Sequence, residues 1–257
     1  MLRGFYTAAS GILMQERTLN VLTNNMVNSQ TPGFRASRVV STTFDQEFMT
    51  RYERMNGPSA IGVGSPIRVV SDVPTQFDPS SLEETGRPFD VAINGDGFFN
   101  YQVTDAEGNQ TQYLGRNGNF DIDAEGFLVL PGVGRVLGEK GPIQFEELHT
   151  DFIIETDGQV YDAEGTVIDR LLITQPPQDA KMVVAENGMF QVEDIALNEQ
   201  INDRTILVQG WTERSNVDLN REYTLAIEAQ RAFQACSSAL QIVDKINQKA
   251  AQQIASL

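Results

Sequence analysis

The residues in this chain best suited to chemistry are acidic, and one acidic run resembles the first half of a calcium-binding loop. Asp121, Asp123 and Glu125 stand at alternating positions and are followed by Gly126. A loop of this kind closes on a bidentate Glu at its twelfth position, which in this chain is Gly132. Because that ligand is missing, the sequence favours a surface hairpin over a calcium site.

Two glycine pairs and a single histidine complete the candidates for a site. Gly95-Asp96-Gly97 and Gly132-Val133-Gly134 resemble phosphate-binding loops, but each lacks the third glycine and the following helix. His149 is the only histidine, which excludes a histidine cluster around a metal and weakens any Ser-His-Asp arrangement. We therefore predict no catalytic residue, no cofactor site and no metal site, and we expect that the chain is not an enzyme.

Two other classes of function stay open at this stage. Acidic residues are plentiful, so a carboxylate pair of the kind that glycosidases use could serve a cell-wall hydrolase, although nothing singles out such a pair. Trp211 and scattered tyrosines could instead serve a carbohydrate-binding β module with a coiled-coil oligomeriser. A cleared band on a cell-wall zymogram, abolished by one carboxylate substitution, would establish the enzyme.

The net charge of −16 is carried by the middle of the chain. Residues 1–50 hold 4 basic and 3 acidic side chains and residues 211–257 hold 5 of each, whereas residues 51–210 hold 10 basic and 27 acidic ones. Near-neutral ends can pack on copies of themselves, while an acidic middle belongs in water. No basic stripe is available for phosphates, so we expect no nucleic-acid partner.

Both ends of the chain have the heptad pattern that is typical of long paired helices. Residues 219–257 contain no Gly or Pro and would form a rod of about 58 Å. A shorter helix is predicted from residue 4 to about residue 28, ending before Pro32-Gly33. The predicted assembly seam comprises Phe5, Ala9, Ile12, Leu19, Leu22, Met26, Phe233, Cys236, Leu240, Val243, Ile246, Ala250, Ile254 and Leu257.

A second apolar stripe flanks the C-terminal seam and contains Ala239, Ile242, Ile246 and Ile254. One partner helix would leave that stripe in water, so more than one neighbour is expected. The alternative is an ordinary amphipathic core helix. Ser215 and Asp218 fit a capping box that would begin the C-terminal helix.

Between the helical ends the sequence predicts an extended arm and then antiparallel β structure. Residues 31–75 are irregular, polar and interrupted by Gly and Pro. Short strand-like runs follow, and Asp-Ala-Glu-Gly occurs between them at 105–108, 123–126 and 162–165, where each glycine can supply the positive φ of a hairpin turn. The predicted fold class is α+β: a terminal helical domain (1–30 plus 216–257), an arm or linker (31–75) and an antiparallel β domain (76–210).

Neither a membrane span nor a cleavable signal peptide is expected. No run approaches the roughly 18 apolar residues of a span. The first residues resemble a signal peptide only faintly, because the helical pattern continues past Glu16 and Arg17. One cysteine excludes an internal disulfide, and the position of Cys236 on the seam predicts a small buried hydrophobic side chain.

Three blocks of sequence resemble bacterial flagellar axial proteins, specifically the rod and hook family of the basal body. Residues 19–35 are similar to the family's N-terminal signature, 90–99 and 116–126 to its β-domain blocks, and 209–233 to its C-terminal signature. The blocks stand in the family's order and span nearly the whole chain. The signature positions are Asn24, Asn25, Asn28, Pro32, Gly33, Phe34, Asp90, Gly95, Gly97, Phe98, Phe99, Arg116, Gly118, Phe120, Ser215, Asn216, Val217, Asp218 and Arg231.

The resemblance implies a structural subunit that polymerises helically into the hollow rod, which carries torque from motor to hook. The implied partners are copies of itself, other rod subunits, the hook protein, surrounding basal-body components and the export apparatus, which would pass the chain unfolded across the inner membrane to the periplasm and cell wall. The single β domain favours a rod protein, the distal one over the proximal one, with a hook protein as the alternative. We also expect a folded β domain and disordered ends in the free monomer.

Overall fold

The computed structural model describes residues 2–44, 47–53, 57–64, 67–104, 108–145, 152–162, 164–177, 180, 182–185, 188–192, 198–201 and 205–255. Within 2–3, 43–68 and 253–255 only the backbone is described, so the side chain of Ile254 lies outside the described part, as do His149, Leu257 and residues 105–107 of the first Asp-Ala-Glu-Gly copy. The chain divides into two compact units. The helical unit contains Met1–Ser29, Arg35–Phe77 and Val217–Leu257, and the β unit contains Gln30–Phe34 and Asp78–Asn216.

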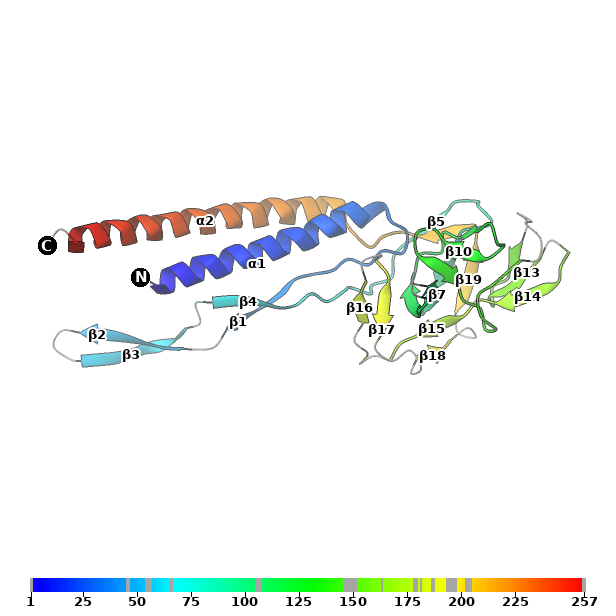
Figure 1. Ribbon diagram of the computed structural model, residues 1–257, viewed down its shortest axis with the longest axis horizontal. Coiled ribbons are helices and arrows are strands. Elements are labelled where there is room, and N and C mark those ends of the chain that lie inside the picture. Colours follow the sequence, from blue (N-terminus) through cyan, green and yellow to red (C-terminus); the bar gives the residue numbers. More distant parts are fainter. Residues whose placement is uncertain are drawn as a thin grey trace. The chain divides into compact units, whose positions relative to one another are not determined.

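Two long helices dominate the helical unit. Helix α1 comprises Leu2–Val27 and continues into a 3-10 turn at Asn28–Gln30, so the predicted end of the first helix before Pro32 is confirmed. Helix α2 comprises Leu219–Ala255. Figure 1 shows the two helices side by side, with the N-terminus of α1 toward the C-terminal half of α2. Within the described residues, neither helix combines the length and apolar character that a membrane span requires.

The cap of α2 differs from the predicted one. The Asp218 carboxylate accepts hydrogen bonds from the backbone N–H groups of Asn220 at 3.0 Å and Arg221 at 3.3 Å, as a helix N-cap does. Ser215 lies before the helix, where its carbonyl accepts a hydrogen bond from Ser80 Oγ. The predicted cap at Ser215 is therefore wrong, because the carboxylate of Asp218 already satisfies the first free N–H groups of α2.

Residues 31–75 are more regular than the sequence predicted. Strand β1 (Val40–Phe44) pairs antiparallel with β4 (Ile67–Asp72), and β2 (Glu47–Glu53) pairs antiparallel with β3 (Gly57–Gly64). The Gly and Pro content of this segment suggested irregular structure, but both ribbons are two-stranded. Every strand in such a ribbon has an open edge, and open edges tolerate residues that a central strand excludes.

The β unit is built from short strands. They are β5 (Leu82–Glu84), β6 (Val91–Asn94), β7 (Phe98–Thr104), β8 (Gln110–Gly115), β9 (Asp121–Ile122), β10 (Leu128–Leu130), β11 (Gly134–Val136), β12 (Ile153–Ile154), β13 (Gln159–Tyr161), β14 (Val167–Arg170), β15 (Ile173–Gln175), β16 (Met182–Val184), β17 (Phe190–Val192), β18 (Glu199–Gln200), β19 (Ile206–Gln209) and β20 (Trp211–Glu213). Residues 170–173 span the end of β14 and the start of β15, and Gly210, at φ 80°, separates β19 from β20.

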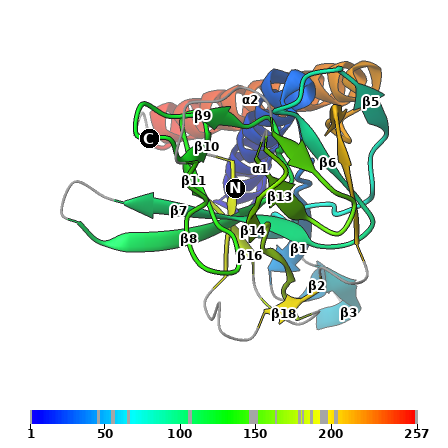
Figure 2. The same cartoon turned by 90° about the vertical axis from the view of Figure 1, so that its right-hand side faces the viewer.

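Strand β7 organises the largest sheet, whose main path runs β16-β17-β8-β7-β11-β10-β9 (Figure 2). Strand β15 also pairs with β7, and β18 pairs with β15. Smaller sheets are formed by β12-β13-β14, by β19 with β6 and by β20 with β5. Every pairing between described strands is antiparallel. The predicted α+β class with antiparallel sheets is confirmed.

The main core cluster of the β unit contains aromatic side chains at its centre. Phe99, Tyr101 and Phe120 are fully buried, and the rings of Phe99 and Phe120 meet edge to face with centroids 5.2 Å apart. The Tyr101 hydroxyl donates a hydrogen bond to the Asn117 carbonyl at 2.5 Å. Burial raises the pKa of the Tyr101 phenol well above its ordinary value. The phenol therefore stays neutral through the physiological range.

Candidate assembly surface

One face of α2 is withdrawn from water at alternating spacings of four and three residues. The buried or half-buried positions on this face are Glu222, Ala226, Ala229, Phe233, Cys236, Leu240, Val243, Asn247 and Ala250. A Cβ atom placed on Gly11 would lie 2.8 Å from Cys236 Sγ, and one placed on Gly4 would lie 3.7 Å from Val243 Cγ2. This face of α2 therefore contacts α1.

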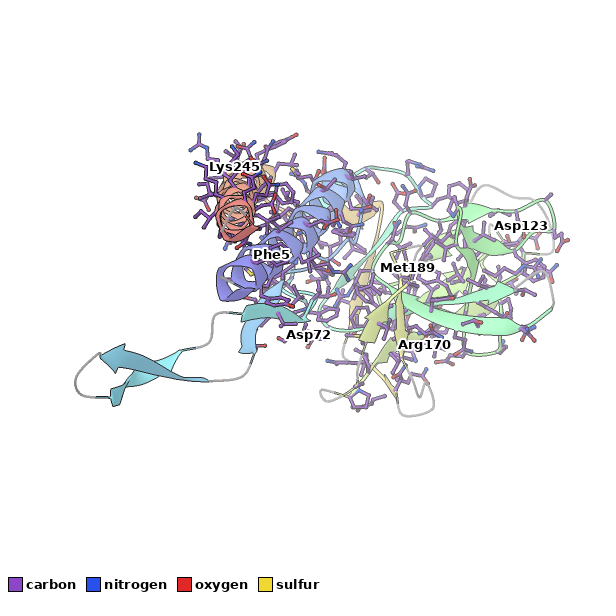
Figure 3. All side chains as sticks on the ribbon, turned by 60° about the vertical axis from the view of Figure 1, so that its left-hand side comes forward. Phe5, Asp72, Asp123, Arg170, Met189 and Lys245 are labelled. Atoms are coloured by element: carbon purple, nitrogen blue, oxygen red, sulfur yellow. The ribbon has the colours of Figure 1, made fainter. Side chains whose placement is uncertain are left out.

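The facing side of α1 includes the predicted Leu22 but otherwise lies one residue earlier in each turn than the predicted seam. The buried or half-buried positions at heptad spacing are Ala8, Gly11, Gln15, Thr18, Leu22 and Asn25. The predicted Ala9, Ile12, Leu19 and Met26 lie beside this face and are half-buried, and Phe5 is exposed (Figure 3). The hydropathy pattern predicted a face made of the larger apolar side chains. In the structure, mainly glycine, alanine and polar residues make the contact, because they let the helices approach closely.

Large apolar side chains remain exposed on the outer sides of both helices. On α1, Tyr6 is 57% and Leu13 is 66% exposed. On α2, Ile242 is 58% and Ile246 is 52% exposed, and Ala239 next to them is exposed as well. Ile246, which was predicted as a seam residue, therefore lies on the second apolar stripe of α2. The single chain leaves the described part of this stripe, Ala239, Ile242 and Ile246, in water.

Asn25 ends the contact between the two helices with polar groups. It is fully buried, and its amide Nδ2 donates to Glu222 Oε2 at 3.2 Å and to the Ser37 carbonyl at 2.9 Å. Its neighbour Asn24 is exposed, and the Asn24 carbonyl accepts a hydrogen bond from Asn28 Nδ2 at 2.9 Å. The structure thus separates two adjacent signature residues: one joins the helices, and the other faces solvent.

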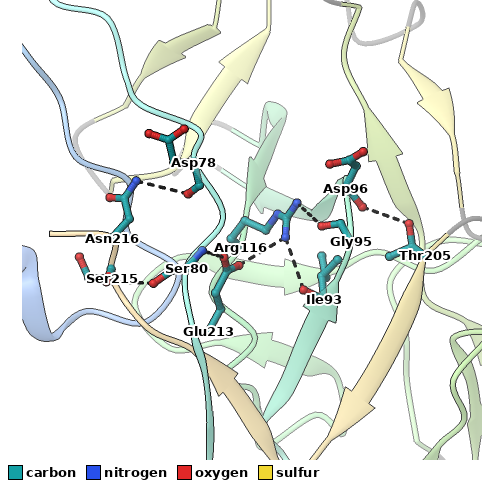
Figure 4. A network of polar contacts seen from close by, with 10 residues as sticks. All are labelled: Asp78, Ser80, Ile93, Gly95, Asp96, Arg116, Thr205, Glu213, Ser215 and Asn216. Carbon is teal, nitrogen blue, oxygen red and sulfur yellow. Dashed lines mark hydrogen bonds and ion pairs between the residues drawn. The ribbon is translucent and has the colours of Figure 1, made fainter.

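In the β unit, signature residues meet around a buried ion pair (Figure 4). Arg116 is 8% and Glu213 is 2% exposed, and Arg116 Nη1 lies 3.4 Å from Glu213 Oε2. Arg116 also donates to the Gly95 carbonyl at 2.8 Å, and Glu213 Oε1 accepts from the Ser80 N–H at 3.3 Å. Ser80 Oγ in turn donates to the Ser215 carbonyl at 3.1 Å. Ser80 therefore joins the segment that enters this unit at Asp78 to the segment that leaves it at Asn216, and the ion pair connects Glu213 to Arg116.

Gly33 lies at the same place in the β unit. Its N–H donates to the Glu213 carbonyl at 2.8 Å, and its φ is +68°. A Cβ atom on Gly33 would collide with the backbone of Arg116 and Asn117. The carbonyl of the following Phe34 accepts a hydrogen bond from the Asn216 N–H at 3.4 Å. The Pro32-Gly33 signature therefore allows a backbone approach that no residue with a side chain permits.

The other signature residues of the β unit belong to its core. Asp90, Phe98, Phe99, Gly97, Gly118 and Phe120 are all buried. The Gly118 carbonyl accepts a hydrogen bond from the Val91 N–H at 2.9 Å, and a Cβ atom on Gly118 would collide with the Val91 carbonyl. In the helical unit, Asp218 caps α2, Val217 is half-buried and Arg231 is exposed.

The acidic run that resembles a calcium loop forms a hairpin, as predicted. Asp123 Oδ1 accepts hydrogen bonds from the N–H groups of Glu125 at 2.9 Å and Phe127 at 2.8 Å, and Gly126 has φ +83°. Arg135 Nη2 pairs with Glu125 Oε2 at 2.5 Å. The side chains of Asp123 and Glu125 are thus engaged by the turn and by Arg135. Gly108 and Gly165, the last residues of the other two Asp-Ala-Glu-Gly copies, also have positive φ.

Sequence reasoning missed three charged residues that these contacts depend on. Glu222 had a signal, because it stands four residues before Ala226 and continues the heptad of α2 with an acidic side chain. Glu213 and Arg38 had none, since Glu213 pairs with a residue 97 positions away and Arg38 pairs with Glu222 from outside either helix.

Comparison with known proteins gives the class. A family model described as "Flagellar hook protein FlgE/F/G D1 domain" matches residues 92–162, and one described as "Flagellar basal body rod FlgEFG protein C-terminal" matches residues 208–253. These matches define a protein of the flagellar rod and hook class.

Full-length relatives narrow the class. The flagellar basal-body rod protein FlgG of Bacillus subtilis is 32% identical over 278 residues, covering 97% of this chain and 98% of that protein. FlgF of Caulobacter vibrioides, also a basal-body rod protein, is 25% identical over 98% of both chains, and the hook-basal body complex protein FlhO of Bacillus subtilis is 26% identical over 100% of both. The chain belongs to the flagellar basal-body rod protein family, and it is a structural subunit of the rod in the flagellar basal body.

Proposed function

We propose that the chain polymerises helically through α1 and α2 and thereby contributes to the hollow axle that transmits torque from motor to hook. The observation that carries the proposal is the apolar surface that the single chain leaves on its helices. Leu13, Ile242 and Ile246 are each more than half exposed. Burial of such a side chain contributes roughly 1.5–3 kcal/mol, so each neighbouring subunit that covers them stabilises the assembly.

The distribution of charge along the chain also supports polymerisation through the helices. The stretches 1–50 and 211–257, which contain α1 and α2, are nearly neutral, whereas residues 51–210 hold 27 acidic and 10 basic side chains. Dense packing of identical neutral surfaces involves little electrostatic repulsion, and identical acidic surfaces repel one another. We therefore place the helices in the packing layer and the β unit toward solvent.

The finer domain organisation is part of this proposal. We propose that α1 and α2 act as a coiled-coil pair within a terminal helical domain, residues 1–30 plus 216–257. Residues 31–75 act as the arm, and residues 76–210 fold as the inserted β domain. The division of the chain into a helical and a β unit supports boundaries near residues 76 and 216.

We further propose that the chain has no catalytic activity, binds no cofactor and inserts into no membrane. Its proposed partners are copies of itself, other rod subunits, the hook protein and the export apparatus. The names of the relatives support partners within the basal body, because FlgG and FlgF are rod proteins and FlhO belongs to the hook-basal body complex. Among rod subunits, the sequence resemblance favours the distal one.

A charge placed on the exposed stripe of α2 tests the polymerisation. We expect the Ile242→Asp/Ile246→Asp variant to stay monomeric by sedimentation and electron microscopy under conditions in which the wild-type protein forms filaments. The matched control, Gln234→Asp/Gln241→Asp, adds the same charge at two exposed polar positions of α2 and should polymerise. Filaments of the isoleucine variant equal to those of the control would contradict the proposal.

A further inference from the structure

A buried polar cluster holds α1, α2 and residues 37–38 together. Asn25 Oδ1 accepts a hydrogen bond from the Ser37 N–H at 3.0 Å, and Asn25 Nδ2 donates to the Ser37 carbonyl and to Glu222 Oε2. Arg38 Nη2 lies 2.5 Å from Glu222 Oε1, and the Glu222 side chain is 0% exposed. Both oxygens of a fully buried carboxylate are thus engaged, one by an amide and one by a guanidinium group.

The cluster sits on the contact between the two helices and not beside it. Gly4 lies against Val243, Gly11 against Cys236, and Asn25 against Glu222. From the first contact to the second, the position on α1 advances by seven residues and the position on α2 goes back by seven. From the second contact to the third, the two positions advance and go back by fourteen. The helices are therefore antiparallel, and the three contacts share one register. The same spacing places Thr18 opposite Ala229. Asn25 and Glu222 therefore form a fully buried polar layer of the seam, whereas the layers at Gly4 and Gly11 pair glycine with valine and cysteine.

The Gly11 layer distinguishes this register only weakly from the registers one heptad away. A shift by one heptad moves Gly11 from Cys236 to Ala229 or to Val243, and each of these is a small or medium apolar side chain that a glycine surface accommodates. Swaps of this kind between apolar partners cost little compared with the loss of polar partners. Packing at the Gly11 layer therefore contributes little to the choice of register.

The polar layer does distinguish the registers. A shift in one direction places Thr18 opposite Glu222 and moves Asn25 beyond the start of α2, and a shift in the other places Asn25 opposite Ala229. In both cases Glu222 loses the Asn25 amide. A buried carboxylate without its partners is strongly unfavourable, so the penalty falls on the shifted registers alone.

We propose that Asn25, Glu222 and Arg38 form a register key that selects one alignment of the terminal helices and rejects the alignments one heptad away. A polar residue in an otherwise apolar seam is the best-attested device for fixing helix register. Arg38 adds a condition, because the key is complete only when residues 37–38 lie against both helices. The inference rests on the helix pairing put forward under the proposed function.

Cys236 makes the register measurable in the whole chain, because it is the only cysteine. A Cβ atom at position 11 lies 2.8 Å from Cys236 Sγ, which is within reach of a disulfide, so Gly11→Cys reports the observed register. Gly4→Cys reports the shift that brings residue 4 to Cys236, and Thr18→Cys reports the opposite shift. Each variant is assembled and oxidised, and the intrachain disulfide is quantified by non-reducing electrophoresis and peptide mass spectrometry.

With the key intact, we expect the disulfide in Gly11→Cys and at least about tenfold less in Gly4→Cys and Thr18→Cys. In an Asn25→Leu or Glu222→Leu background, the two shifted reporters should rise to within about threefold of Gly11→Cys. The matched controls Asn24→Leu and Glu228→Leu change exposed residues of the same helices and should keep the single register.

The outcomes distinguish a failure of the register key from a failure of the helix pairing. No disulfide in Gly11→Cys with the key intact would contradict the helix pairing itself. A disulfide confined to Gly11→Cys in both leucine backgrounds would overturn the key and leave the pairing standing. If the leucine variants do not assemble, Glu222→Gln decides: it keeps the shape and the Asn25 contact but removes the charge that pairs with Arg38. Shifted reporters above the level seen with the key intact would support the key, and unchanged ones would overturn it.

Discussion

The two units of this protein bury very different side chains. The β unit has a main core cluster that includes Phe99, Tyr101 and Phe120, all with less than 2% of their surface exposed. In the helical unit, the buried apolar side chains among the described residues are three alanines and one leucine: Ala8, Ala36, Ala229 and Leu22. Large apolar side chains of that unit, such as Leu13 and Ile242, are exposed instead.

The difference indicates which unit can fold alone. Ordering one residue costs about 1–2 kcal/mol of backbone entropy, and long helices in water depend on burial of an apolar face to offset it. Alanine burial contributes far less than the roughly 1.5–3 kcal/mol of a large side chain. Apolar burial within the β unit can therefore offset the entropy lost when that unit folds. The helices bury too little apolar surface of their own, and we expect them to need surfaces from neighbouring subunits. We therefore expect folding of the ends and polymerisation to be one coupled event.

The largest effect on the helical side is expected from Cys236→Arg. The thiol lies against Gly11, so a guanidinium group there would be forced into the contact between α1 and α2 without a partner. We expect this variant not to form filaments in a sedimentation assay. Cys236→Ser keeps the size and should assemble with a small defect. Rapid labelling of the Cys236 thiol in intact wild-type filaments would contradict the predicted burial.

The largest effect on the β side is expected from Arg116→Ala. Removal of this side chain takes away the guanidinium group that lies 3.4 Å from the buried Glu213 carboxylate, and breaking a buried ion pair costs about 3–5 kcal/mol in the free energy of unfolding. Urea unfolding of the dilute protein, followed by Trp211 fluorescence, measures the change. Arg214→Ala is the control, because Arg214 is 61% exposed and lies 3.6 Å from Glu83, and such surface pairs contribute roughly 0–1 kcal/mol. Equal effects of the two substitutions would show that the buried pair does not stabilise the unit.

A smaller effect separates two glycines with similar backbone angles. Gly33 has φ +68° and Gly165 has φ +81°, so alanine is strained at both. A Cβ atom on Gly33 would also meet the backbone of Arg116, whereas one on Gly165 would meet open space. We expect Gly33→Ala to lose about 1–3 kcal/mol more unfolding free energy than Gly165→Ala and to assemble less well. Equal losses of unfolding free energy in the two variants would contradict a stabilising role for the close backbone approach at Gly33.

The smallest effect concerns pH. Burial raises the pKa of Tyr101 above the value near 10 that the unfolded chain has, so the stability that this group contributes is fully present below about pH 10 and is lost as pH rises through the folded-state pKa. The urea midpoint of the dilute protein should fall between about pH 9 and about pH 11. Tyr101→Phe should fall less steeply over that range, although it starts about 1 kcal/mol lower because the Asn117 carbonyl loses its donor. Identical slopes would contradict the role of Tyr101.

Much of this architecture was predictable from the sequence. Hydrophobic periodicity located both helices, and turn chemistry located hairpins such as the one at Gly126, because both signals are local. The contact face of α1 was displaced by one residue, since Gly11 and Asn25 make the contact and hydropathy gives them no weight. The ion pair between Arg116 and Glu213 was not predictable, because the two residues are 97 positions apart and meet only in the folded chain.

Protection of the chain ends tests the coupling of folding to assembly most directly. Limited proteolysis of the full-length protein is compared in the dilute state, where it sediments as a single chain, and in filaments. The account predicts rapid loss of residues 1–30 and 220–257 in the dilute state, a resistant acidic core from about residue 76 to about residue 210, and resistance throughout the chain in filaments. Protected ends in the dilute single chain would contradict it.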